Sequence, residues 1–90
     1  MAMSGQTTVT TAGTEVQLNA NQACRSVVIK ALTANTGIMY IGNNGDNTVA
    51  STTGYPLSGG DYVVLEVLNL NNIYVDASVN GEKVAWIVLS

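Results

Sequence analysis

Residues 58–89, SGGDYVVLEVLNLNNIYVDASVNGEKVAWIVL, decide the fold of this 90-residue chain. They contain three short runs, residues 62–67, 73–77 and 84–88, and each run is rich in β-branched and aromatic side chains. Gly or Asn residues bound the runs, a pattern typical of strands that are joined by turns. The stretch therefore predicts three consecutive β-strands arranged as a meander.

The sharpest local signal in this stretch is the pair Asn80-Gly81. Both residue types tolerate positive φ, which suits the type I′ turn whose twist matches that of the flanking strands. We therefore predict that residues 73–77 and 83–89 pair with each other as a β-hairpin.

Short strands are also predicted in the first half of the chain. Residues 26–31 alternate in polarity, and residues 38–41 have no polar member, which indicates a strand covered on both faces. Residues 7–11 and 15–18 predict two short peripheral strands. Seven or eight short strands without any helical periodicity predict an all-β fold, a small antiparallel β-sandwich.

The chain is short enough to form one domain with a modest core. Residues 1–6 are small and polar without periodicity, so we predict a flexible N-terminal arm there. Residues 7–90 are then a single β-sandwich domain.

The alternation of side chains assigns one face of each strand to the core of the sandwich. The predicted core consists of Val27, Ile29, Met39, Ile41, Val63, Leu65, Val67, Ile73, Val75, Val84, Trp86 and Val88. The opposite faces are unusually apolar, because they carry Val28, Ile38, Tyr40, Tyr62, Val64, Tyr74, Ala85, Ile87 and Leu89. Such faces favour association, so we predict a homo-oligomer, a trimer, whose interface includes Tyr62, Val64, Ile87 and Leu89.

The composition supports a protein partner and argues against nucleic acid and membranes. Hydrophobic residues make up 47% of the chain and charged residues only 10%, well below the usual ~25%. The net charge of −3 provides no cationic field for phosphates. No run approaches the ~20 apolar residues of a membrane span, and the first residues lack the features of a secretory leader, so we expect synthesis in a cytoplasm.

The residues that usually perform chemistry are scarce, so we predict no enzymatic activity and no cofactor or metal site. The chain has no histidine and a single cysteine, Cys24, which excludes an intramolecular disulfide. The neighbouring Arg25 could lower the pKa of the Cys24 thiol, but there is no basic partner, and a buried or interface thiol is favoured. Glu66 and Asp76 lie on strands that could be neighbours, yet solvated charges are favoured over a glycosidase pair.

Two further patterns have the composition of binding sites. Residues 43–47, NNGDN, are rich in oxygen ligands but provide one carboxylate, so a solvated turn is favoured over a calcium loop. The aromatic residues Tyr40, Tyr55, Tyr62, Tyr74 and Trp86 could stack on sugars, although aromatics in small β domains more often fill cores and interfaces.

The chain resembles the small structural proteins of tailed bacteriophage particles, over roughly residues 16–89. The resemblance lies in the succession VVIKA (27–31), NTGIMYIGN (35–43), TGYPL (53–57), GDYVVLEV (60–67) and LNNIYVDA (70–77). These are patterns of strands and turns, and they carry no ligand residues. The resemblance implies a compact β-sandwich or jelly-roll module of a virion.

The resemblance further implies a capsid decoration, or cement, protein. Such a subunit is made in the host cytoplasm, assembles as a trimer on the head surface and binds the major capsid protein across subunit boundaries. Its mechanism is mechanical, because binding stabilises the form of the shell that is bound. We expect Asn- and Thr-rich segments to contact the shell, with Thr7, Thr8, Asn43, Asn44 and Tyr55 as candidates.

The alternative function is a carbohydrate- or receptor-binding module on a phage tail or fibre. The positions of the tyrosine side chains separate the decoration function from the carbohydrate-binding function. An exposed concave patch that gathers Tyr40, Tyr55 and Tyr74 would favour sugar binding, whereas tyrosines between subunits would favour decoration.

Overall fold

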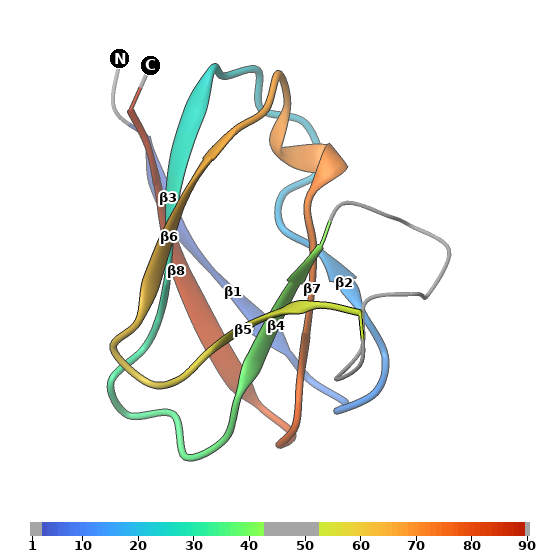
Figure 1. The fold of residues 1–90 in the computed structure, drawn as a ribbon. Helices are drawn as coiled ribbons and strands as arrows, with labels where there is room; N and C mark the ends of the chain where they lie inside the picture. The colour runs from blue at the N-terminus through green and yellow to red at the C-terminus, as the bar shows by residue number, and fades with distance from the viewer. Residues whose placement is uncertain (1–2, 43–52, 90) are drawn as a thin grey trace.

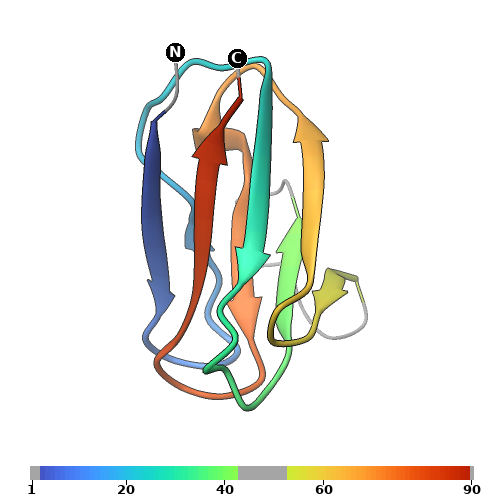
Figure 2. The same cartoon turned by 90° about the vertical axis from the view of Figure 1, so that its left-hand side faces the viewer.

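The computed structural model describes residues 3–42 and 53–89, which form two four-stranded antiparallel sheets packed face to face (Figure 1). One sheet, here the long sheet, has the order β1-β8-β3-β6. Its strands are β1 (Ser4–Val9), β8 (Glu82–Val88), β3 (Ser26–Ala31) and β6 (Tyr62–Glu66). Figure 2 shows this sheet facing the viewer.

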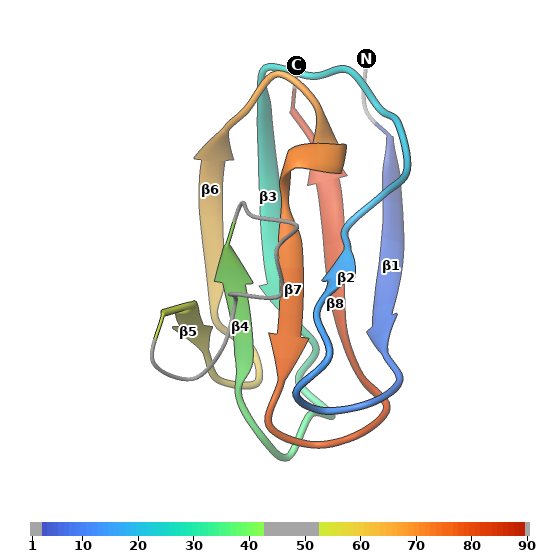
Figure 3. The ribbon, with the colours of Figure 1, turned by 90° about the vertical axis from the view of Figure 1, so that its right-hand side faces the viewer.

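The other sheet, here the short sheet, has the order β2-β7-β4-β5 and faces the viewer in Figure 3. Its strands are β2 (Val16–Gln17), β7 (Tyr74–Ala77), β4 (Met39–Gly42) and β5 (Tyr55–Leu57). A single turn of 3₁₀ helix, η1 (Leu70–Asn72), is the only helical element among the described residues. The predicted all-β sandwich of seven or eight short strands is confirmed.

The strand pairs are nested, and this nesting makes the fold a jelly roll. The pair β4·β5 is enclosed by β3·β6, then by β2·β7, and finally by β1·β8. The chain is thus a long antiparallel ribbon that has rolled up, and the rolling creates the further pairs β3·β8 and β4·β7.

The core lies between the two sheets and contains the predicted inward faces. Nine of the twelve predicted core residues are buried, and the other three, Val63, Leu65 and Val67, are half-buried and pack against them. Val9, Leu18, Ala31, Leu57, Leu70 and Ala77 complete the core. The period of two along each strand therefore indicated the correct face wherever a strand was recognised.

Trp86 closes the core at the β1 edge of the long sheet. Its cross-strand partner is Gly5, and a methyl group on Gly5 would come within 2.6 Å of the indole ring. The indole Nε1 donates to the Thr7 hydroxyl at 3.3 Å, and that hydroxyl donates to the Leu18 carbonyl oxygen of the short sheet at 2.7 Å. The absence of a side chain at position 5 thus makes room for Trp86, and Thr7 links the two sheets.

The predicted meander and the predicted hairpin at Asn80-Gly81 are wrong. β7 belongs to the short sheet and β8 to the long sheet, so residues 78–81 form an arch across the sandwich. Gly81 does have the positive φ that was expected, +81°. β6 pairs with β3 and not with β7, so none of the three final strands are neighbours.

Long-range hydrogen bonds fix this arch in place. The Glu82 carboxylate accepts backbone N–H groups from Thr36 (2.5 Å) and Gly37 (2.7 Å), and the Ser78 hydroxyl accepts the N–H of Ile38 at 2.8 Å. These bonds tie residues 78–82 to the β3–β4 crossover. Asn80 Oδ1 likewise accepts the N–H of Ala12, in the β1–β2 crossover, at 2.7 Å.

The boundary predicted for the N-terminal arm also needs correction. Residues 4–6 are not part of an arm, because they form the first half of β1 and pair with Ala85, Trp86 and Ile87 of β8. The register on β8 and the close fit of Gly5 under Trp86 order this polar segment, although its own sequence buries little.

Replacing Trp86 by alanine should lower the free energy of unfolding by about 3–5 kcal/mol, because it leaves a cavity where the indole fills the space beside Gly5. Denaturant unfolding followed by circular dichroism measures this. Lys83→Ala, on the same strand but exposed and outside the core, is the matched control. Equal losses for the two variants would contradict the placement of Trp86.

Stability should depend on pH through Glu82. The N–H groups of Thr36 and Gly37 lower the pKa of its carboxyl in the folded state, so its contribution is present above the unfolded pKa of about 4.3 and lost as pH falls through the lower folded value. Glu82→Gln should flatten this part of the pH profile of unfolding relative to the wild type. Parallel profiles for wild type and Glu82→Gln would refute this role.

Candidate functional site: the outer face of the long sheet

The outer face of the long sheet is the surface that the strand alternation turns away from the core. Two rows of cross-strand neighbours cross it. Ser4, Ile87, Val28 and Val64 form one row, and Gln6, Ala85, Lys30 and Tyr62 form the next. Neighbours within such a row lie about 5 Å apart, close enough for their side chains to touch.

Large apolar side chains on this face remain in contact with solvent. Tyr62 is 66% exposed, Val64 and Leu89 are each 51% exposed, and Ile87 is 42% exposed. Val28 is half-buried between Val64 and Ile87 and joins them across β3. The four residues predicted for an oligomer interface therefore lie on one face, and Val28 connects them into a single patch, here the apolar patch.

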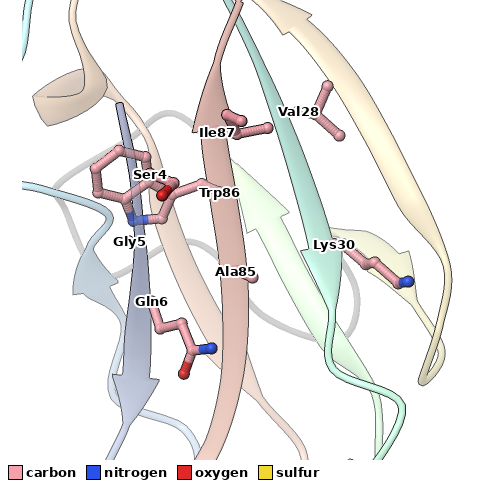
Figure 4. A pocket seen from close by; sticks show the side chains of 8 residues that line it. All are labelled: Ser4, Gly5, Gln6, Val28, Lys30, Ala85, Trp86 and Ile87. Carbon is pink, nitrogen blue, oxygen red and sulfur yellow. The ribbon is translucent and has the colours of Figure 1, made fainter. Parts of the chain in front are cut away.

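A shallow hollow of about 370 Å³ lies beside the apolar patch (Figure 4). It exists because Ala85, a small residue, lies between longer neighbours on β1 and β3. Gln6 borders it on the β1 side, and Val28 and Lys30 border it on the β3 side. The face is thus hollowed near its middle and provides both apolar surface and hydrogen-bonding groups.

A second hollow, of about 420 Å³, opens between the sheets beneath the β6 edge. It is mainly apolar and is lined by Ile41, Gly42, Tyr55, Val63, Leu65, Glu66, Val67 and Ile73. The sandwich is therefore less tightly closed at β6 than at β1, where Trp86 fills the corresponding position.

The residues predicted to contact a shell are placed differently. Thr8 is exposed on β1, and Tyr55 is 60% exposed on β5 beside the second hollow. The Thr7 hydroxyl is used inside the fold, in bonds to Trp86 and Leu18, so its position does not favour a contact role. Asn43 and Asn44 lie outside the described residues, as does the rest of the 43–47 loop.

The candidate catalytic groups are not brought together. Glu66 lies in the long sheet and Asp76 in the short sheet, so they are not on neighbouring strands. Burial raises the pKa of the Cys24 thiol, which is half-buried and donates to the Val67 carbonyl oxygen at 3.2 Å, in keeping with the interpretation favoured over a nucleophile. Over residues 3–42 and 53–89, no three His, Cys, Asp or Glu side chains gather as metal ligands.

The three tyrosines that separate the two functional hypotheses do not form one patch. Tyr40 and Tyr74 lie on the outer face of the short sheet, where Tyr40 pairs with Asp76 and Tyr74 with Gly42. Tyr55 pairs with the inward-facing Ile41 and lines the hollow between the sheets. Asp76 is itself buried and accepts the N–H of Gly13 at 2.9 Å, which occupies one of its oxygens.

Sequence reasoning missed the contribution of β1 to this face. Ser4 and Gln6 border the first hollow, yet the sequence predicts an arm there because residues 4–6 lack large side chains. The available signal was the match between the glycine at position 5 and the tryptophan at position 86, which only the register of β1 on β8 reveals.

No helix of the described residues is long and apolar enough to cross a membrane. Comparison of the chain with protein-family models, with curated proteins and with solved structures found no match.

Proposed function

We propose that this chain is a structural subunit that functions as a closed homo-oligomer, with the outer face of the long sheet turned toward its symmetry axis. The observation that carries this proposal is the apolar patch, in which Tyr62, Val64, Ile87 and Leu89 are all exposed on one face. Monomeric proteins seldom expose large side chains together in this way. Association of copies would cover them.

The energetics favour assembly only when several contacts act together. Complete burial of a large apolar side chain is worth about 1.5–3 kcal/mol, and the patch residues are already about half covered. Association costs an estimated 4–15 kcal/mol in lost freedom of motion. Burial of the apolar patch would offset a substantial part of this free-energy cost, and hydrogen bonds between copies must offset the remainder.

We further propose that the oligomer is a trimer and decorates the head of a tailed bacteriophage. The trimer and the phage particle rest on the resemblance of the strand and turn patterns. The jelly roll is compatible with this function, since viral capsid proteins use this architecture. Lectins also use it, however, so the fold alone does not choose between the two hypotheses.

The proposed mechanism is bridging. A trimer bound across several capsid subunits has to be detached before those subunits can separate, so its binding free energy adds to the stability of the shell. Exposed polar residues such as Thr8, together with Tyr55, are candidates for the contact with the major capsid protein.

No specific observation favours the carbohydrate-binding alternative. Tyr40 and Tyr74 share a face, but Tyr55 is directed to the other side of its sheet. The hollow that Tyr55 lines is mainly apolar, whereas a sugar site needs several convergent polar groups beside its aromatic surface.

Val64→Asp should dissociate the oligomer while leaving the fold intact, because an unpaired carboxylate is costly in an apolar interface. Sedimentation velocity should show loss of the oligomer, and circular dichroism should remain unchanged. Val79→Asp is the matched control, since Val79 is 41% exposed and lies in the β7–β8 arch outside the patch. An oligomer that survives Val64→Asp would exclude the patch as its interface.

The phage assignment predicts that purified heads stripped of this protein rebind the wild-type chain and then resist heating better. Binding is measured by co-sedimentation, and head integrity by release of packaged DNA on heating. Val64→Asp should bind more weakly, because monomers lose the avidity of three linked sites. Failure of the wild-type oligomer to bind heads would reject the decoration role and leave the assembly proposal standing.

A further inference from the structure

The edges of the two sheets differ in a way that bears on assembly. The short sheet ends in β2, with two residues, and β5, with three residues including Pro56. Short strands and proline are common means of preventing edge-to-edge pairing. The long sheet ends in β1 and β6, with six and five residues and no proline. Within the described residues, only the long sheet has edges able to accept another strand.

The backbone groups at these two edges can be located from the ladder. Val67 N–H donates to the Arg25 carbonyl oxygen, and Ala31 N–H donates to the Asp61 carbonyl oxygen. The backbone N–H and C=O groups of the odd-numbered residues of β6 therefore point toward β3. Because backbone direction alternates along an antiparallel strand, the N–H and C=O groups of Tyr62, Val64 and Glu66 point away from the sheet.

The backbone groups of β1 alternate in the same way. Val88 N–H donates to the Met3 carbonyl oxygen at 2.7 Å, so the backbone N–H and C=O groups of the odd-numbered residues of β1 point toward β8. The N–H and C=O groups of Ser4, Gln6 and Thr8 therefore point outward. On both edges, the residues with outward backbone groups are those whose side chains lie on the outer face.

Strand direction makes the two edges complementary. The long sheet has an even number of alternating strands, so β6 runs antiparallel to β1. A rotation about an axis along the strands preserves these directions, and it brings β6 of one copy beside β1 of the next in antiparallel orientation. The outer faces of successive copies are then continuous.

We infer that β6 of one copy pairs with β1 of the next and that this contact closes the ring of subunits. The inference rests on the proposed closed oligomer, and it supplies the hydrogen bonds which that oligomer requires. In the register that pairs Val64 with Gln6 of the next copy, Glu66 pairs with Ser4 and Tyr62 pairs with Thr8. No like charges then face each other, because residues 4–9 carry none.

Alternative edge contacts leave an edge unused or require an even number of subunits. A β6·β6 pair around a two-fold axis leaves β1 of both copies unpaired. Adding a β1·β1 pair about a second two-fold axis uses those edges too, but this arrangement needs an even number of copies and cannot give a trimer. The β6·β1 contact is the one edge contact that pairs both edges of every copy in a ring of three subunits. It also turns the apolar patches toward the axis, where they cover one another.

Disulfide trapping tests this contact in the full chain. In a Cys24→Ser background, unlabelled Gln6→Cys protein is mixed with ¹⁵N-labelled Val64→Cys protein, allowed to exchange subunits, and oxidised. Directly paired residues have Cα atoms about 5.5 Å apart, which suits a disulfide. Within one chain, residues 6 and 64 lie on strands that are three spacings, about 14 Å, apart, so no intramolecular bond can form.

Mass spectrometry under denaturing, non-reducing conditions should show the mixed 6–64 dimer as the main product, and the double variant should form a covalent ring of three chains. Thr33→Cys with Val64→Cys is the control for random collision, because Thr33 is exposed outside the sheet edges. A closed oligomer that yields 64–64 dimers, or no 6–64 product above this control, overturns the edge contact but not the proposed function. A wild-type protein that is monomeric overturns both.

Discussion

The packing of the two sheets against each other is the interaction on which the rest of the structure depends. It buries one face of each strand, and the described chain has enough inward apolar residues for one such layer, centred on Ile29, Met39, Val75 and Val84. The layer is sealed at the β1 edge, where Trp86 covers Gly5, and is more open beneath β6. Every other feature of the molecule lies around this layer.

Two consequences follow from burying a single layer. The crossovers between sheets need polar anchors, and Glu82, Ser78 and Asn80 provide them by accepting backbone N–H groups from distant loops. The outer face of the long sheet, in contrast, has no second layer within the described residues, although it carries Tyr62, Val64, Ile87 and Leu89. The charge that would normally keep such a face in water is scarce in this chain. The proposed assembly would resolve this imbalance by covering that face.

The local sequence predicted which segments form strands and which side chains face inward, but it did not predict the strand neighbours. Alternation fixes the face of a strand independently of its partner, so Val75 and Trp86 were placed correctly although β7 and β8 are in different sheets. The turn signal at Asn80-Gly81 is real, because Gly81 has positive φ. It failed as a hairpin signal because bonds from Glu82 and Ser78 to residues 36–38 hold the chain in an arch.

The candidate site could likewise be predicted only in part, because alternation is visible in the sequence and strand register is not. Its four exposed apolar residues follow from alternation, whereas the hollow at Ala85 and the contribution of Ser4 and Gln6 depend on the register between β1 and β8. The most direct test of the assembly face is sedimentation equilibrium of the unmodified protein over a micromolar dilution series. The proposed trimer predicts a species of about 28 kDa, three times the 9.4 kDa chain. A single 9.4 kDa species throughout the series would contradict it.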